Sequence, residues 1–143
     1  MRRRSRAREY ALQILYQVEL RNETPDEVIR QFWENAEDLS KEDAKEADIR
    51  DFAAVLVKKV LEHRDAIDKD IEQSAEHWKI SRMALVDRNI LRLGACEILH
   101  LGDTPAKVAI NEAIELAKKF GDADSPKFVN GILDKVAKTH NSL

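Results

Sequence analysis

Apolar residues recur along the N-terminal part of the chain at intervals of three and four, which is the period of an amphipathic α-helix. The first stripe lies within residues 7–18, and Leu12 and Tyr16 fall outside it. Thr24 followed by Pro25 has the pattern of a capping residue and a first helical position, so a second helix is predicted to begin there. Each helix is expected to place one face in a core.

The middle of the chain predicts two more helices joined by short connections. Residues 37–46 have no apolar period and indicate a solvated connection, after which residues 49–60 carry a third stripe. The stripe breaks phase around residues 63–65 and resumes over residues 67–78. We therefore expect a turn followed by a fourth helix with Trp78 on its inner face.

The C-terminal half predicts three further helices. Residues 83–101 are apolar almost all round and follow Ser81, a candidate cap, so this helix belongs in the middle of a bundle. A sixth helix is expected to begin at residues 103–105 and to end at Gly121 in a left-handed conformation. A seventh begins at residues 124–126, and in both helices a Thr or Ser cap precedes the proline. Seven helices and no strand predict an all-α fold.

Composition agrees with a helical globular protein. Of 143 residues, 43% are hydrophobic and 36% charged, which fits one compact domain or two closely packed halves, and four Gly with three Pro argue against an all-β chain. The single cysteine, Cys96, cannot form an internal disulfide and is expected to be a buried thiol in a reducing compartment. With no apolar run of 18 residues and no signal-peptide pattern, we expect a cytoplasmic protein.

Charge is distributed unevenly around a net value of -3. Residues 1–10 hold five Arg and one Glu, whereas residues 22–51 hold eleven acidic and four basic residues. Cations at the start of a helix oppose its dipole, so the arginine run indicates a polyanionic partner. Arginine forms bidentate hydrogen bonds with phosphate and stacks on bases, which favours RNA, and the alternative is a solubilising tail that binds nothing.

The loop of residues 120–128 is a second candidate for phosphate binding. The backbone N–H groups at a helix start can bind an anion, Lys127 adds a positive charge, and Phe128 could stack on an unpaired base. The alternative is a plain turn between helices with Phe120 and Phe128 in the core.

Other candidate chemistry is limited. The four histidines lack metal-ligand spacing, and no catalytic or nucleotide-binding motif is present, so no metal, cofactor or enzymatic activity is expected. Charged residues do interrupt the apolar fifth helix, either as internal ion pairs or as a polar seam for a protein partner. They are Asp87, Arg88, Arg92 and Glu97.

Three segments resemble the NusB family of bacterial transcription antitermination proteins. They are residues 3–16, residues 86–92 and residues 108–134, the last with the runs VAINEAIELAK and KFVNGILD. The resemblance covers nearly the whole chain. It implies a single domain, residues 1–143, made of two small helical bundles, roughly residues 1–63 and 64–143.

The resemblance also implies a function. A NusB-like protein would pair with NusE, a small-subunit ribosomal protein, bind the single-stranded boxA element of ribosomal RNA and join the RNA polymerase antitermination complex. The implied RNA-binding residues are Arg3, Arg4, Arg6, Arg8, Lys118, Asp124, Ser125, Lys127 and Phe128. The implied NusE-binding residues are Tyr16 and Asp87. The resemblance leads us to expect the longer Glu at position 87, and Asp87 departs from this expectation.

Alternatives remain at this point. Some ribosomal RNA methyltransferases carry a NusB-like domain, but a chain ending at Leu143 leaves no room for a cofactor-binding domain, so we expect no enzyme. A helical protein-protein adaptor that never touches RNA is the other alternative. Both a monomer and a homodimer are compatible with the sequence. The sequence specifies neither the preferred RNA bases nor the role of residues 22–51.

Overall fold

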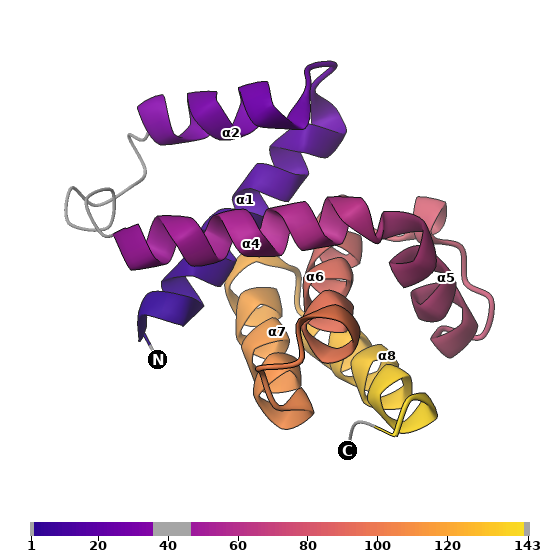
Figure 1. The fold of residues 1–143 in the computed structure, drawn as a ribbon. Helices are drawn as coiled ribbons and strands as arrows, with labels where there is room; N and C mark the ends of the chain where they lie inside the picture. The colour runs from indigo at the N-terminus through magenta and orange to yellow at the C-terminus, as the bar shows by residue number, and fades with distance from the viewer. Residues whose placement is uncertain (1, 36–46, 142–143) are drawn as a thin grey trace. The chain divides into compact units, whose positions relative to one another are not determined.

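The computed structural model describes residues 2–35 and 47–141, and the expected connection at residues 37–46 lies outside them. The described residues form seven α-helices and no strand, which confirms the all-α prediction (Figure 1). The α-helices are α1 (Arg2–Leu20), α2 (Pro25–Glu34), α4 (Ala47–Glu62), α5 (Arg64–Ser74), α6 (Leu85–Cys96), α7 (Ala106–Phe120) and α8 (Ser125–Thr139), with a 3-10 turn η1 (Ile80–Arg82) and a π segment η2 (Glu97–Leu101).

The chain divides into two compact units, Met1–Val57 and Lys58–Leu143. No helix among the described residues is both long and apolar enough to cross a membrane.

Helix α1 has the apolar stripe that the spacing predicts. Ala7, Ala11 and Ile14 have no exposed surface, and Tyr16 is exposed, as expected for residues on and off the stripe. Leu12, which falls outside the stripe, is nevertheless buried. Leu12 lies one turn after Arg8, which is also buried, so α1 buries a second side that a single stripe does not predict.

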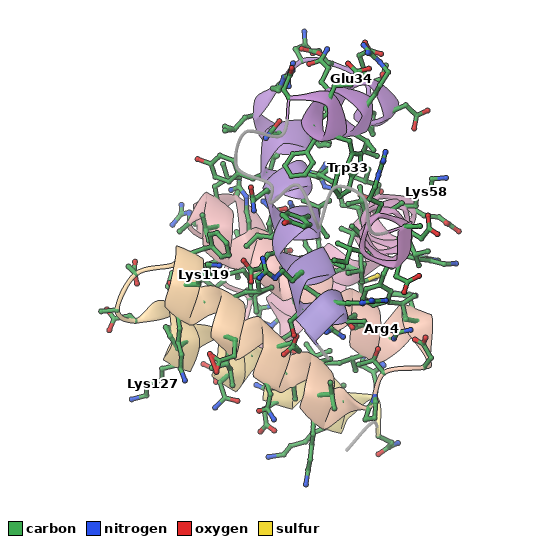
Figure 2. All side chains as sticks on the ribbon, turned by 90° about the vertical axis from the view of Figure 1, so that its left-hand side faces the viewer. Arg4, Trp33, Glu34, Lys58, Lys119 and Lys127 are labelled. Carbon is green, nitrogen blue, oxygen red and sulfur yellow. The ribbon has the colours of Figure 1, made fainter. Side chains whose placement is uncertain are left out.

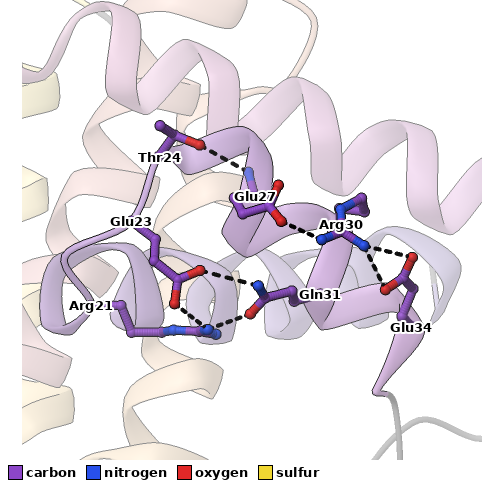
Figure 3. A network of polar contacts seen from close by, with 7 residues as sticks. All are labelled: Arg21, Glu23, Thr24, Glu27, Arg30, Gln31 and Glu34. Atoms are coloured by element: carbon purple, nitrogen blue, oxygen red, sulfur yellow. Dashed lines mark hydrogen bonds and ion pairs between the residues drawn. The ribbon is translucent and has the colours of Figure 1, made fainter.

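Helix α2 begins where the capping pattern predicts. The Thr24 hydroxyl accepts a hydrogen bond from the Glu27 backbone N–H at 3.3 Å, and Pro25 is the first helical residue. Arg21 at the end of α1 donates hydrogen bonds to Glu23, at 2.6 Å, and to Gln31 of α2 (Figure 3). These contacts fix the corner between the two helices.

Aromatic rings fill the space inside the first unit. The Trp33 ring lies edge-on to the rings of Tyr10, at 5.8 Å between centroids, and Phe32, at 5.1 Å. The Arg50 guanidinium of α4 lies 5.2 Å from the Trp33 ring centroid. The aromatic cluster therefore joins α1, α2 and the first part of α4.

In the second unit α6 packs against α5, α7 and α8, so its nearly continuous apolar surface is central as predicted (Figure 1). Ile90, Leu91 and Leu93 are buried, and Gly94 allows close packing with α8. A Cβ atom at position 94 would lie 2.5 Å from the Cδ1 atom of Leu133. Any larger residue at position 94 would therefore require α8 side chains to move.

The prediction for the fourth helix was wrong at its C-terminal end. Helix α5 stops at Ser74, and Glu76 and His77 have left-handed backbones with φ values of 55° and 68°. Trp78 therefore lies in a turn, where it is 50% exposed, and not on the inner face of a helix. The Glu72 side chain holds this turn by accepting a hydrogen bond from the backbone N–H of Ile80 at 2.8 Å.

Two predicted caps were also wrong. Ser81 lies inside η1, and α6 begins four residues later, with Ala84 at the N-cap position. Thr104 does not cap α7, because Pro105 occupies the N-cap position and no side chain makes a capping hydrogen bond there. Residues 82–84 separate Ser81 from α6, and Pro105 alone separates Thr104 from α7.

Arg92 forms an internal ion pair, which was one of the two interpretations of the charged residues in this helix. Its Nε and Nη2 atoms donate to the two carboxylate oxygens of Asp68 in α5, at 2.8 and 3.1 Å, and its Nη1 atom donates to Asn89 at 3.3 Å. The Arg92 side chain is almost fully buried, and that of Asp68 is partly exposed. A bidentate geometry satisfies the guanidinium and joins α5 to α6.

Replacing Asp68 with alanine is expected to lower the free energy of unfolding by about 3 kcal/mol, because the buried charge of Arg92 would lose its partner. Urea denaturation measures this change. The matched control is Lys69→Ala on the exposed side of α5, expected to change stability by less than about 0.5 kcal/mol. If the two variants unfolded at the same urea concentration, the ion pair would not stabilise the unit.

Candidate nucleic-acid interface

The arginine run forms the first turns of α1, and the first turn of this helix contains no acidic residue of its own. The Nη1 atom of Arg3 lies 2.8 Å from a carboxylate oxygen of Asp48 in α4. The Arg4 guanidinium lies 4.3 Å from the ring centroid of Phe52, one turn further along α4. Figure 2 shows Arg4 at the start of α1.

These contacts offset part of the unfavourable interaction between the arginines and the helix dipole. A cation over an aromatic face contributes about 0.5–1 kcal/mol at an exposed site, and an exposed ion pair contributes less than about 1 kcal/mol. Both interactions are weak, and the Arg3 and Arg4 side chains remain exposed.

Arg8 differs from the other three arginines of the predicted RNA surface. Arg3, Arg4 and Arg6 are exposed, whereas Arg8 is only 4% exposed. Its guanidinium lies 5.5 Å from the Phe52 ring centroid. Burial gives Arg8 a packing role in the first unit, so the accessible positive charge on this part of α1 belongs to Arg3, Arg4 and Arg6.

The loop between α7 and α8 is held by Asp122 and Ser125. One carboxylate oxygen of Asp122 accepts from the backbone N–H groups of Asp124 and Ser125, at 3.0 and 3.2 Å, and from the Ser125 hydroxyl at 3.2 Å. The Ser125 hydroxyl in turn accepts from the Asp122 backbone N–H at 3.0 Å. Ser125 was expected to cap α8, but it is the first residue of the helix, and Asp124 holds the N-cap position without a side-chain hydrogen bond. The Asp122 carboxylate instead accepts from the N–H groups at the start of the helix.

The predicted left-handed conformation of Gly121 was also wrong. Gly121 has φ -91° and ψ -168°, which any residue can adopt. Space is the constraint, because a Cβ atom at this position would lie 2.5 Å from the Ser125 hydroxyl oxygen and 2.9 Å from the Ala117 carbonyl oxygen. Glycine therefore allows α7 and α8 to meet at a tight corner.

The structure separates the predicted loop residues into accessible and buried ones. Lys118, Asp124 and Lys127 are exposed, and Lys127 extends away from the ribbon in Figure 2. Ser125 is buried, so it shapes the loop. Phe128 is partly buried, with its ring edge-on to Trp78 at 5.2 Å between centroids and 69° between planes.

The two residues of the predicted NusE surface differ in accessibility. Tyr16 on α1 is 36% exposed, and Asp87 in the first turn of α6 is 9% exposed. Tyr16 is therefore the more accessible of the two for a protein partner.

Cys96, His63 and His100 are titratable residues that lie outside this interface. Burial, followed by the nearby Glu97 carboxylate, raises the pKa of the Cys96 thiol to about 12, so this cysteine is a protonated and unreactive packing residue. The imidazoles of His63 and His100 stack at 4.1 Å, and burial lowers the pKa of His100. Within residues 2–35 and 47–141, no three His, Cys, Asp or Glu side chains are grouped to hold a metal ion.

The family model of NusB matches residues 5–138. The chain belongs to the NusB family. This one match includes residues 86–92 and 108–134 and all but the first two residues of the segment 3–16, and the curated relatives carry the name of a transcription antitermination protein rather than of an enzyme.

The sequences of individual NusB proteins align with almost the whole chain. The transcription antitermination protein NusB of Anaeromyxobacter dehalogenans is 49% identical over 135 residues, which are 94% of this chain and 90% of that protein. The protein of the same name from Myxococcus xanthus is 46% identical over 138 residues, 96% of each chain.

Solved NusB structures share the fold. The structure of T. maritima NusB has a TM-score of 0.82 and 35% identity, covering 94% of this chain and 90% of its own. A chain in a structure of the antitermination factors NusB and NusE with double-stranded RNA has a TM-score of 0.84 and 33% identity, covering 97% of this chain and 98% of its own.

Sequence reasoning missed several residues that shape this NusB surface. Asp48 and Phe52 contact arginines 44 to 48 positions away in the chain, and no local pattern links them. Asp122 lies before the predicted helix start at residues 124–126, where Ser125 has the pattern of a cap, so the sequence gives no signal for its role. Trp78 has the spacing of a core residue. The left-handed backbone at Glu76 and His77, which directly precede it, places Trp78 at the surface.

Replacing Asp122 with alanine is expected to lower the free energy of unfolding by about 1–2 kcal/mol, because α8 would lose its capping carboxylate. Asp124→Ala is the matched control and removes only an exposed charge near the helix start, at a cost of about 0.3 kcal/mol. Thermal melts of the two variants measure the difference. Equal losses would contradict the assignment of the cap to Asp122.

Proposed function

We propose that this NusB family protein is an RNA-binding transcription antitermination factor that acts with NusE on boxA RNA. The observation that carries the proposal is the group of exposed arginines at the start of α1, Arg3, Arg4 and Arg6. The names of the curated relatives support a role in antitermination, and the solved complex of NusB and NusE with double-stranded RNA supports binding of RNA and NusE.

The proposed α1 contact is with the phosphate backbone. Arginine donates planar, bidentate hydrogen bonds to phosphate, and unlike lysine it also stacks on a base. The α-helix fixes the backbone that carries the three guanidinium groups, so RNA binding would order their side chains and not the chain itself.

In the second unit, the proposed RNA contacts are Lys118, Asp124, Lys127 and Phe128, with buried Ser125 supporting them. The lysines supply charge, and the partly exposed ring of Phe128 offers a surface for a base. Asp124 would repel a nearby phosphate, which makes it a position that tunes affinity.

Tyr16 is the proposed anchor for NusE, with Asp87 as an additional contact. Exposed tyrosines often contribute strongly to protein-protein interfaces. A function that requires RNA polymerase and nascent RNA also leads us to propose a cytoplasmic location. A protein adaptor without RNA binding is the second candidate, and only Tyr16 favours it.

Replacing Arg4 and Arg6 together with alanine is expected to weaken binding of single-stranded boxA RNA and to flatten its salt dependence. If each arginine neutralises one phosphate, the slope of log affinity against log salt should change by about 1–1.4. Gel shifts or anisotropy titrations over a salt series measure the slope.

Two controls accompany this measurement. Lys107→Ala with Lys135→Ala removes the same charge from exposed positions on α7 and α8 and should leave the slope nearly unchanged. Arg8→Ala should reduce thermal stability and leave the slope unaltered, because Arg8 is buried. A double arginine variant with wild-type affinity and slope would refute the proposed α1 contact.

Replacing Tyr16 with alanine is expected to weaken NusE binding by at least about 1 kcal/mol and to leave the melting temperature within a few degrees of wild type, because Tyr16 is exposed. Calorimetry with purified NusE and a thermal melt measure the two quantities. Val55→Ala changes another exposed apolar residue and serves as the control. Large destabilisation with unchanged NusE affinity would place Tyr16 in the core.

A further inference from the structure

Trp78 is an exposed aromatic residue that neither the core nor the family resemblance explains. Half of its surface is accessible, whereas Ile67 and Ile71, which precede it on the same predicted stripe, are fully buried. Its ring lies edge-on to Phe128, with 5.2 Å between centroids. Two segments separated by 50 residues therefore form one aromatic pair, with Trp78 as its exposed member.

The turn that presents Trp78 is strained and well connected. Glu76 and His77 both have left-handed backbones, which are unfavourable for residues other than glycine. The Trp78 backbone N–H donates to the Ala75 carbonyl at 3.1 Å, and Glu72 accepts from Ile80 on the far side of the turn at 2.8 Å. Strain held by hydrogen bonds keeps the indole at the surface, and such strain is typical of binding sites.

The charges beside the aromatic pair suit a polyanion. Lys79 follows Trp78, Arg82 ends η1, and Lys127 precedes Phe128, and all three are exposed. Two acidic residues, Glu76 and Asp124, lie near the same segments in sequence. Aromatic rings with flanking cations are the usual components of single-stranded nucleic-acid sites, where bases stack on the rings and cations contact phosphates.

We propose that Trp78, supported by Phe128, stacks on an unpaired base of the bound RNA. This inference rests on the proposed function and extends the RNA surface from the α7–α8 loop to the turn between α5 and η1. Stacking does not select a particular base, because every base has an aromatic face. The site should therefore distinguish single-stranded from double-stranded RNA, in which base faces are covered.

Tryptophan fluorescence provides a direct test. The chain has two tryptophans, so Trp33→Phe leaves Trp78 as the only one. Titration with single-stranded boxA RNA is expected to quench Trp78 fluorescence. The same RNA annealed to its complement should leave the fluorescence nearly unchanged.

Affinity measurements test the same site without the Trp33 substitution. Trp78→Ala is expected to weaken binding of single-stranded boxA RNA by about 5- to 150-fold, the range for loss of one stacked base. The salt slope should stay at its wild-type value, because no phosphate contact is removed. Trp78→Phe should retain most of the affinity, and Val108→Ala, another exposed apolar position in the second unit, should retain all of it.

The outcomes separate this inference from the function on which it rests. If wild-type protein showed no salt-sensitive RNA binding, the proposed function would fail. If wild type bound RNA while Trp78 fluorescence was unchanged and Trp78→Ala bound as well as Val108→Ala, only the stacking site would be overturned. A fluorescence change with NusE and none with RNA would also overturn it, since Trp78 would then contact a protein. Thermal melts verify that each variant is folded.

Discussion

Positive charge at the start of α1 has to be stabilised for the arginines of the proposed surface to be held on a helix. Five arginines lie within the first seven residues of this helix, where mutual repulsion and the helix dipole both oppose helix formation. Phe52 and Asp48 of α4 counter this effect with one ring that lies near two guanidinium groups and one carboxylate that pairs with a third. The arrangement keeps the charge in helical form and leaves most of it accessible.

Hydrophobic periodicity was sufficient to predict the number of helices and most of their buried faces. The stripe of α1, the start of α2 and the central position of α6 all follow from residue spacing, because burial of one helix face is the dominant local signal. Turns were predicted less well. A period of 3.6 residues extends through Trp78 in the sequence, and the left-handed backbone at Glu76 and His77 that ends it involves no Gly or Pro.

The residue types and positions of the candidate site could be predicted from the sequence, whereas the burial and hydrogen bonds of its side chains could not. Charge counting located the arginine run, and the chemistry of a helix start beside Lys127 and Phe128, together with the family resemblance, located the loop before α8. Neither could show that Arg8 is buried, because its environment depends on Phe52, 44 residues later. Likewise, Asp122 and Asp124 are both plausible caps in the sequence, and only backbone geometry decides between them.

The corner between α7 and α8 carries a consequence for how this sequence can change over evolution. Gly121 has no room for a Cβ atom because the Ser125 side chain occupies that space, and Ser125 is held there by Asp122. A mutation at any one of these three positions would disturb the other two, so acceptable substitutions would have to arrive together. Asp124 and Lys127, which are exposed on either side, are free of this restriction. Single mutations at these two positions can therefore change the charge of the loop while its shape is preserved.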